Sequence, residues 1–207
     1  MIINSVTKYK GTTYEVVTDG NKIYLHRDIV ADFGLRPGAE ISTEKYGEML
    51  LASDRRRATE RALYLLDYRD YSYVELFRKL RENYDEDICY YAVDKLVSLG
   101  MINDRRYAEN LARKYIEVKK FGAYRASREM YQKGLDRELV DEVLSAYEDG
   151  TRERICEIIR KKYSGSLDDR DKVRKMKNAL VRQGYSFDDI NAAVKMMDCE
   201  DDDESYY

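Results

Sequence analysis

Residues 122–134 read GAYRASREMYQKG, and they repeat, fifty residues further on, the pattern of residues 72–84, SYVELFRKLRENY. A third copy ends at Gly184. Each copy has an apolar residue four positions before a site of chain reversal: Leu80 before Tyr84, which follows Asn83, Met130 before Gly134, and Leu180 before Gly184. Further pairs in this register are Ser72 and Gly122, Leu66 and Ile116, Leu76 and Ala126, and Val140 and Ile190. A fixed period in this range, filled by helical patterns, indicates a tandem array rather than a globule around one central pocket.

The apolar positions that follow Thr43 have a helical period. Between residues 104 and 118 they fall at steps of three and four, which puts them on one helix face: Tyr107, Ala108, Leu111, Ala112, Tyr115 and Ile116. Ser72 and Glu75 form a capping box, and Ser186 and Asp189 repeat its logic with a shorter acid. Gly100, Gly134 and Gly184 lie where helices must reverse.

These signals predict a mainly α-helical fold of three tandem repeats, each of three short helices. The expected helices are 54–70, 73–83 and 86–99, then 104–120, 123–133 and 136–148, then 151–163, 168–183 and 186–197. Since such units cannot each bury a full core, we expect them to stack into an elongated, curved array. The corresponding domains are 51–103, 104–150 and 151–197, followed by an acidic, disordered tail at 198–207.

The first fifty residues differ in kind and predict a small module that contains a β-hairpin. Residues 12–17 and 22–26 are rich in β-forming residues and flank Asp19-Gly20, a pair that favours a tight hairpin turn. We expect a short helix at 28–33 and a brief strand at 39–41. Residues 1–50 hold too little apolar surface for a firm core alone, so the module is expected to pack on the first helix of the array.

The composition is that of a soluble intracellular protein. Of 207 residues, 37% are charged, the mean hydropathy is −0.71, and no apolar run is long enough to span a membrane. The N-terminus lacks the apolar segment of a secretory signal, and Cys89, Cys156 and Cys199 form no C-x-x-C pair. We therefore expect a cytoplasmic protein that has no membrane segment.

Charge is unevenly distributed along the chain. Residues 198–207 carry six acids, and without them the net charge of −3 becomes +3. Residues 151–197 hold twelve Lys or Arg against seven Asp or Glu. Such basic runs either meet phosphates or an acidic protein face, or are solvated helix faces with local ion pairs.

The residues for enzyme chemistry are sparse. His26 is the only histidine, which argues against a catalytic triad or a histidine-based metal site. No phosphate-binding loop of the G-x-x-x-x-G-K-[ST] type occurs, and paired acids such as Asp168-Asp169 precede helices, where they offset the helix dipole. We expect no catalytic residue, no cofactor and no metal.

Ordered segments of the chain resemble the RecX regulatory family. They are Ala62-Leu63-Tyr64-Leu65-Leu66, Arg69 to Leu76, Lys79-Leu80, Leu99 to Asp104 with Tyr107-Ala108, Gly122 with Arg125, and Lys133-Gly134-Leu135. The resemblance covers about residues 54–197, and the stretch from Tyr163 to Asp169 follows it more loosely. It implies a non-enzymatic modulator of the RecA recombinase that binds the filament on single-stranded DNA and usually suppresses strand exchange and ATP turnover.

Charge clustering suggests which residues contact the partner. The candidates are Arg105, Arg106, Lys119, Lys120, Arg125, Arg160, Lys161 and Lys162. Residues that match the motif but that we expect to be structural are Ser72, Asp104, Tyr107, Gly122, Gly134 and Gly184, with Asp104 as a cap, Tyr107 as a packed ring, and Gly122 and Gly134 as backbone turns. We expect a monomer. Two alternatives remain: a helix-turn-helix DNA-binding protein that acts without recombinase, and a helical scaffold for an unrelated protein.

Overall fold

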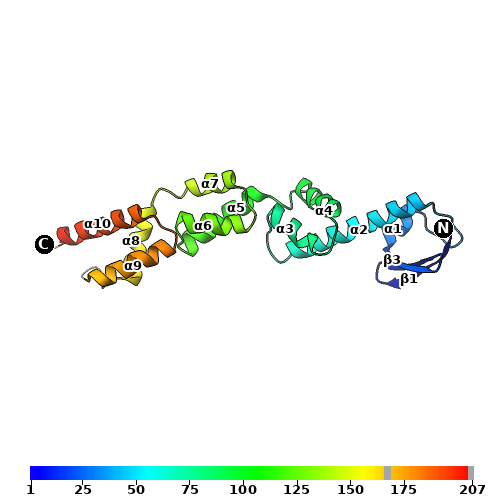
Figure 1. Cartoon of the computed structure of the whole chain (residues 1–207), viewed down its shortest axis with the longest axis horizontal. Helices are drawn as coiled ribbons and strands as arrows, with labels where there is room; N and C mark the ends of the chain where they lie inside the picture. The colour runs from blue at the N-terminus through cyan, green and yellow to red at the C-terminus, as the bar shows by residue number, and fades with distance from the viewer. Residues whose placement is uncertain (166–168, 205–207) are drawn as a thin grey trace. The chain divides into compact units, whose positions relative to one another are not determined.

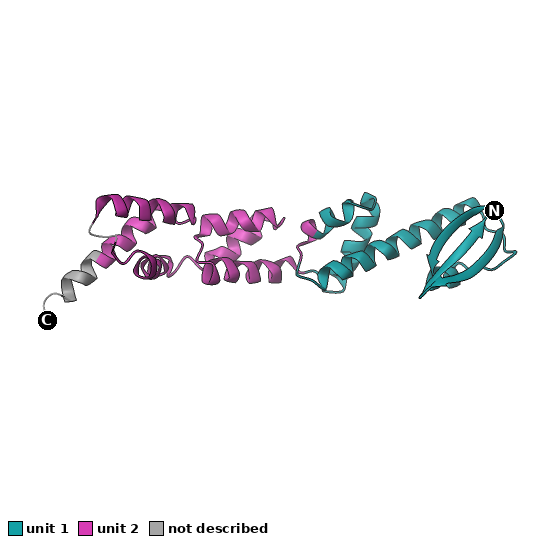
Figure 2. Ribbon diagram, turned by 90° about the horizontal axis from the view of Figure 1, so that it is seen from below, with its two compact units in different colours: residues 1–70, 76–102 teal, residues 71–75, 103–207 magenta. Residues whose placement is uncertain are grey.

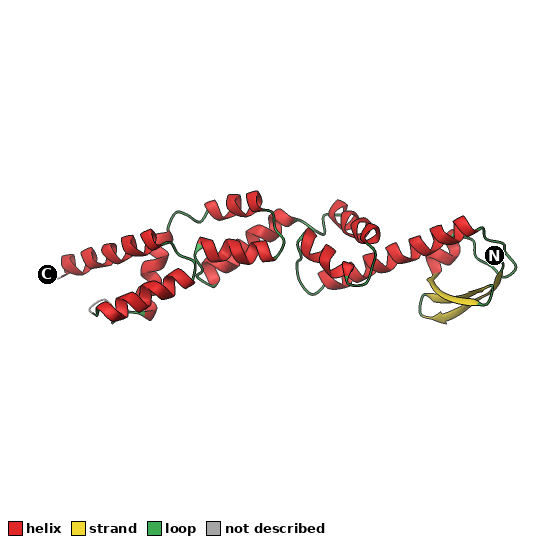
Figure 3. Ribbon diagram, viewed as in Figure 1, coloured by secondary structure: helices red, strands yellow, loops and turns green. Residues whose placement is uncertain are grey.

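The computed structural model describes residues 1–165 and 169–204. It contains two compact units, one of residues 1–70 and 76–102 and one of residues 71–75 and 103–207 (Figure 2). The described strands all belong to the N-terminal module, and helices make up the regular structure of the rest (Figure 3). The predicted fold class, three helical repeats behind a small module with a β-hairpin, is confirmed.

The N-terminal module is a three-stranded antiparallel sheet followed by a short helix. Strands β1 (Ile3–Lys10), β2 (Thr13–Thr18) and β3 (Asn21–His26) lie in the order β1-β2-β3. Asp19 and Gly20 both have positive φ, 45° and 83°, as the predicted hairpin turn requires. Helix α1 (Arg27–Asp32) confirms the predicted short helix. The strand predicted at 39–41 is wrong, because only an isolated bridge between Ile2 and Glu40 forms there.

Helix α2 (Thr43–Leu66) joins this module to the first repeat. It begins eleven residues before the predicted helix at 54, where the Ser42 hydroxyl accepts a hydrogen bond from the Lys45 backbone N–H. Its first half supplies Met49 to the core of the N-terminal module, and Arg56 forms an ion pair with Asp28 of α1 at 3.1 Å. The predicted packing of the module on the first helix is therefore confirmed.

The remaining helices begin and end within a few residues of the predicted bounds, except for the end of α10. Figure 1 labels them along the chain. They are α3 (Tyr73–Arg81) and α4 (Glu86–Ser98), then α5 (Asp104–Arg113), a π-helical segment η1 (Lys114–Val118), α6 (Ala123–Gln132) and α7 (Arg137–Ser145), then α8 (Thr151–Lys162), α9 (Arg170–Arg182) and α10 (Phe187–Glu204). Helix α10 passes the predicted end at 197, because no glycine or proline interrupts residues 198–204. Of the acidic tail, residues 205–207 lie outside the described residues, as do 166–168, where the helix predicted at 168 would begin.

Each of the last two repeats has its own apolar core. In the second repeat α5, η1, α6 and α7 enclose buried side chains such as Leu111, Ile116 and Met130. In the third, α8, α9 and α10 enclose Ile155, Leu180 and Ile190. Positive φ values of 69°, 76° and 95° at Gly100, Gly134 and Gly184 confirm the predicted helix reversals. Among the described helices, none combines the length and the apolar character that a membrane span requires.

Candidate partner-binding surface

Residues 71–75 and the turn at Lys133–Gly134 form a first junction inside the second unit. The Ser72 hydroxyl donates a hydrogen bond to the Lys133 carbonyl oxygen and accepts one from the Glu75 backbone N–H at 3.1 Å. Lys133 Nζ lies 3.0 Å from Glu75 Oε1. A Cβ on Gly134 would lie 2.7 Å from Val74 Cβ, so this glycine provides close approach as well as its positive φ.

Asp104 also belongs to this junction, although not in the way the sequence suggests. Its Oδ1 accepts a hydrogen bond at 2.8 Å from the Tyr73 backbone N–H, so it caps α3. Asn103, rather than Asp104, is the N-cap of α5 and accepts from the Arg106 backbone N–H. Burial raises the pKa of the Asp104 carboxyl, and the bond from Tyr73 partly offsets this. Tyr107 is a buried ring in the core of the second repeat, as predicted.

A second junction lies fifty residues later, between the start of α6 and the turn at Gln183–Gly184, and it is held by backbone hydrogen bonds instead of a side-chain hydroxyl. The Gly122 N–H donates to the Gln183 carbonyl at 2.9 Å, and the Tyr124 N–H donates to the Gly184 carbonyl at 3.3 Å. A Cβ on Gly122 would lie 2.2 Å from the Gly184 carbonyl oxygen. Gly122 has a φ of −74°, so it is needed for this close approach and not, as predicted, for a turn conformation.

The two junctions differ in charge. Arg125 occupies the register of Glu75, and Gln183 that of Lys133, so the ion pair of the first junction has no counterpart in the second. Instead the Arg125 guanidinium lies 4.0 Å from the centre of the Phe121 ring. The guanidinium is attracted to the ring face, and its ion pair with Glu129 is long, at 3.9 Å.

Lys119 joins the same group of side chains. Its ammonium lies 5.1 Å from the ring centre of Tyr115 and 5.4 Å from that of Phe121, and the two rings stack at 5.9 Å. We call Tyr115, Lys119, Phe121 and Arg125 the cation–aromatic cluster. Lys119 is exposed and Arg125 is half-buried, so the cluster presents two cations to solvent on an aromatic base.

The backbone at this cluster is unusual. The π-helical segment Lys114–Val118 ends in a bond from the Lys119 N–H to the Lys114 carbonyl, a rare geometry that is frequent at functional sites. Lys120 has a φ of 55°, rare for a residue with a side chain. Its carbonyl accepts a hydrogen bond from the Tyr185 hydroxyl at 3.1 Å, which ties this strained loop to the third repeat.

Glu157 of α8 connects two of the predicted cations. Its carboxylate accepts hydrogen bonds from Lys161 at 2.7 Å and from Lys120 at 3.0 Å. These two bonds lower the pKa of Glu157 to about 2. The loop after η1 and the helix α8 are therefore held together by a charged group as well as by Tyr185.

The predicted cations thus have different surroundings. The structure brings Lys119, Lys120, Arg125 and Lys161 to the second junction. Arg105 instead forms a bidentate pair with Glu142 of α7 at 2.8 Å, which lowers the pKa of Glu142. Arg106, Arg160 and Lys162 are exposed, and within residues 1–165 and 169–204 neither Arg106 nor Lys162 forms an ion pair. The sequence interpretation missed Tyr115, Phe121, Glu157 and Tyr185, although the exchange of Glu75 for Arg125 was visible in the repeat register.

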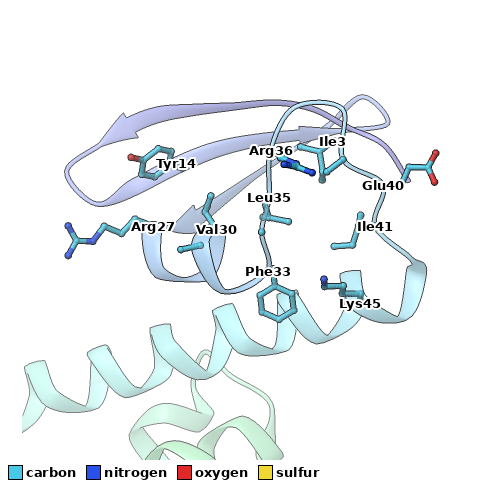
Figure 4. A pocket seen from close by; sticks show the side chains of 13 residues that line it. Ile3, Tyr14, Arg27, Val30, Phe33, Leu35, Arg36, Glu40, Ile41 and Lys45 are labelled. Carbon is cyan, nitrogen blue, oxygen red and sulfur yellow. The ribbon is translucent and has the colours of Figure 1, made fainter.

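One hollow lies apart from the cation–aromatic cluster, and another lies beside it. One, of about 730 Å³, lies next to α1 in the first unit and has the cations Arg27, Arg36 and Lys45 on its lining, but none of the predicted site residues (Figure 4). The other, of about 660 Å³, adjoins the second junction and includes Gly122 and Tyr124 in its lining. Within the described residues, no group of three or more His, Cys, Asp or Glu side chains could hold a metal ion. Cys89 and Cys156 are buried thiols, and the Cys199 side chain lies outside the described part of the chain.

Family models match the three repeats in order. The models of the first, second and third three-helix domains of RecX match residues 58–96, 103–144 and 151–194. The regulatory protein RecX of Bacillus velezensis is 30% identical over 186 residues, covering 86% of this chain and 69% of that protein. The regulatory protein RecX of Clostridioides difficile is 27% identical over 184 residues, covering 87% of each.

Solved structures agree in fold. The crystal structure of RecX from Lactobacillus salivarius has a TM-score of 0.66 and 28% identity, and the match covers 72% of this chain and 99% of that one. A crystal structure of a regulatory protein RecX has a TM-score of 0.71 at 20% identity and covers 92% of this chain and 97% of that one. With three consecutive domain models matched over more than half of its residues, the chain belongs to the RecX family of regulatory proteins.

Proposed function

We propose that this chain is a non-enzymatic regulator that binds RecA filaments on single-stranded DNA and inhibits ATP turnover and strand exchange. Membership in the RecX family supports the regulatory role. The single observation that carries the mode of binding is the second junction, where Lys119, next to the strained residue Lys120, and Arg125 of α6 lie over two stacked rings. The proposal includes a monomeric protein in the cytoplasm.

A tandem array suits a partner that itself repeats. Linked units can contact successive protomers of a filament, and several weak contacts then combine into strong binding while the filament is intact. The same contacts offered to a single recombinase protomer add little, because only one can form at a time. We therefore expect the affinity to depend on filament assembly.

Electrostatics supplies the second element of the proposal. Lys119 and Arg125 both contact aromatic rings. Arg125 also forms an ion pair with Glu129, but this pair is long, at 3.9 Å, and partly exposed, so it is weak and a partner can displace the Glu129 carboxylate. Arg105 is bound more firmly, because its guanidinium makes two hydrogen bonds of 2.8 Å to the Glu142 carboxylate. Binding through Lys119 and Arg125 to acidic protein surface or DNA phosphates should weaken as salt rises.

The test is co-sedimentation with RecA filaments at low and high salt. The variant Lys119→Ala/Arg125→Ala should bind about tenfold more weakly at low salt, since two lost charge contacts of about 0.7 kcal/mol each give that factor. The control is Arg137→Ala/Arg152→Ala, which removes the same charge outside the cluster, one cation from the second repeat and one from the third. Arg137 lies 3.6 Å from Asp141 and Arg152 lies 3.5 Å from Asp189, so each has only a long ion pair.

Two results would contradict the proposal. If the control variant loses as much affinity as the test variant, net charge rather than the cluster governs binding. If the wild-type chain binds bare duplex DNA as tightly as it binds filaments, the helix-turn-helix alternative describes it better.

A further inference from the structure

Helix α2 carries, in the first unit, an exposed stripe of two arginines followed by two tyrosines. Arg57, Arg61, Tyr64 and Tyr68 follow one another at steps of four, three and four, so they lie along one face. Tyr68 lies just past the helix end, and its N–H still bonds to the Leu65 carbonyl, which continues the turn. We call these four residues the Arg–Tyr stripe. It is separate from the cation–aromatic cluster.

The two rings of the stripe support each other and remain open to solvent. Tyr64 is 50% exposed and Tyr68 is 73% exposed. Their ring centres lie 5.2 Å apart with an edge contact, and their hydroxyl groups lie 3.1 Å apart. Because the rings hold each other in place, a ligand that stacks on them has less side-chain freedom to immobilise.

The arginines of the stripe are available to an anion. The Arg61 guanidinium lies 5.3 Å from the Tyr64 ring centre, and within the part of the chain that the structure describes it forms no ion pair. Arg57 is 66% exposed and has only a long pair with Asp54 at 3.6 Å. Exposed pairs of this kind contribute little, so a phosphate group can replace the carboxylate. Of the other acids nearby, Glu60 is already paired with Arg56 at 3.0 Å. Asp85 lines one hollow with Arg57 and Arg61, but within the described residues it forms no ion pair with either.

A second exposed tyrosine pair shows what the stripe has in addition. Tyr9 and Tyr24 lie on the N-terminal sheet with ring centres 4.9 Å apart, and they are 64% and 49% exposed. There the Tyr24 hydroxyl donates to Glu15 at 3.1 Å, and Glu15 also takes the nearby cation Lys22 at 3.3 Å. There the Tyr24 hydroxyl is itself bonded to a carboxylate, whereas in the stripe the two hydroxyls lie against each other and two arginines lie on the same helix face.

We propose that the Arg–Tyr stripe binds single-stranded DNA directly, with bases stacked on Tyr64 and Tyr68 and phosphates held by Arg57 and Arg61. Unpaired bases expose the ring faces that stack on tyrosine, whereas a duplex buries them. The stripe is about 16 Å long, from eleven residues at the helical rise, which suits a short run of nucleotides. The proposal deepens the proposed function, on which it rests for the presence of single-stranded DNA beside the protein.

The test measures binding of the full-length chain to a fluorescein-labelled oligothymidylate by anisotropy, at low salt and without recombinase. Tyr64→Ala/Tyr68→Ala should weaken binding at least about tenfold, the loss expected when the stacking of one or more bases is removed. Tyr64→Phe/Tyr68→Phe should stay within about twofold, because phenylalanine keeps the ring face. Arg57→Gln/Arg61→Gln should weaken binding and make it less dependent on salt.

The matched control is Tyr9→Ala/Tyr24→Ala, which removes the other exposed pair and should bind like the wild type. The proposal is overturned if the wild type does not bind the oligonucleotide, if Tyr64→Ala/Tyr68→Ala binds as well as the wild type, or if the control loses as much. A second measurement, co-sedimentation with RecA filaments, also tests it: the proposal is overturned if Tyr64→Ala/Tyr68→Ala loses affinity for the filament but not for the oligonucleotide, which would make the stripe a protein contact. Since the anisotropy assay contains no recombinase, a negative result there leaves the regulatory proposal standing.

Discussion

The change Gly122→Ala tests the close contact of the second junction. The added methyl group would lie 2.2 Å from the Gly184 carbonyl oxygen, 2.3 Å from its carbonyl carbon and 2.4 Å from the Tyr185 nitrogen. All three are backbone atoms, so no side-chain rotation can relieve the overlap. Alanine tolerates the φ of −74° found at Gly122, so the whole effect should come from this overlap and its consequences.

The expected loss in the free energy of unfolding has two sources, overpacking and broken hydrogen bonds. Overpacking of a tight site costs about 1–3 kcal/mol. Separation of the two segments also breaks the bonds from Gly122 to Gln183 and from Tyr124 to Gly184, at about 1 kcal/mol each. The free energy of unfolding of the second unit should therefore fall by about 3–5 kcal/mol, and its Tm by about 10 °C or more.

The assay is thermal unfolding followed by circular dichroism, with Gly47→Ala as the control. Gly47 lies inside α2 with no atom within 4 Å of its Cβ position and no positive φ, so alanine there should stabilise the chain by about 0.5–1 kcal/mol. The reasoning fails if Gly122→Ala melts within about 2 °C of the wild type, a shift of well under 1 kcal/mol.

Four further variants, at Ser72, Asp104 and Glu157, test the junctions and their charges. Ser72→Ala should lower the free energy of unfolding in urea by about 1–3 kcal/mol, because a buried hydroxyl that bonds both Lys133 and Glu75 is lost; a loss below about 0.5 kcal/mol would contradict its role. Asp104→Ala should cost about 1 kcal/mol through the lost cap on α3. Asp104→Asn keeps the oxygen acceptor and removes a carboxyl whose pKa is raised by burial, so its stability at neutral pH should match or exceed that of the wild type. An Asn variant less stable than the Ala variant would refute this explanation. The pKa of Glu157 is lowered from its ordinary value of 4.5 to about 2. Its contribution to stability is therefore fully present above pH 4.5 and is lost as the pH falls toward 2. Glu157→Gln should therefore flatten the fall of the urea midpoint below about pH 5, and an unchanged slope would show that the bonds from Lys161 and Lys120 do not hold in solution.

Local signals in the sequence predicted most of the helical repeats. Glycine reversals and capping residues such as Ser72 depend on a few neighbouring residues, so their pattern is readable without the fold. Helix α2 was placed too late because its apolar residues serve two different cores: Met49 packs in the N-terminal module, whereas Ala58 and Ala62 are buried further along. A single amphipathic pattern therefore does not run through it. Strand β1 was missed because most of its side chains are exposed or half-exposed and polar.

The candidate surface was predicted only as a set of charges. Lys119, Lys120 and Arg125 were chosen from clustering along the chain, and the structure adds the rings of Tyr115 and Phe121 beneath Lys119 and Arg125. The link from Lys120 to Glu157 joins residues 37 positions apart, a distance at which sequence patterns give no guide to contact. The π-helical segment also depends on tertiary packing, because propensity alone favours the ordinary α-helix there.

The most direct test of the regulatory proposal is ATP turnover by RecA on single-stranded DNA, titrated with this protein at two salt concentrations. The account predicts a fall in turnover at low salt, a smaller fall at high salt, and a weaker effect of Lys119→Ala/Arg125→Ala than of the wild type. Unchanged turnover at both salt concentrations, together with no co-sedimentation with the filament, would contradict it.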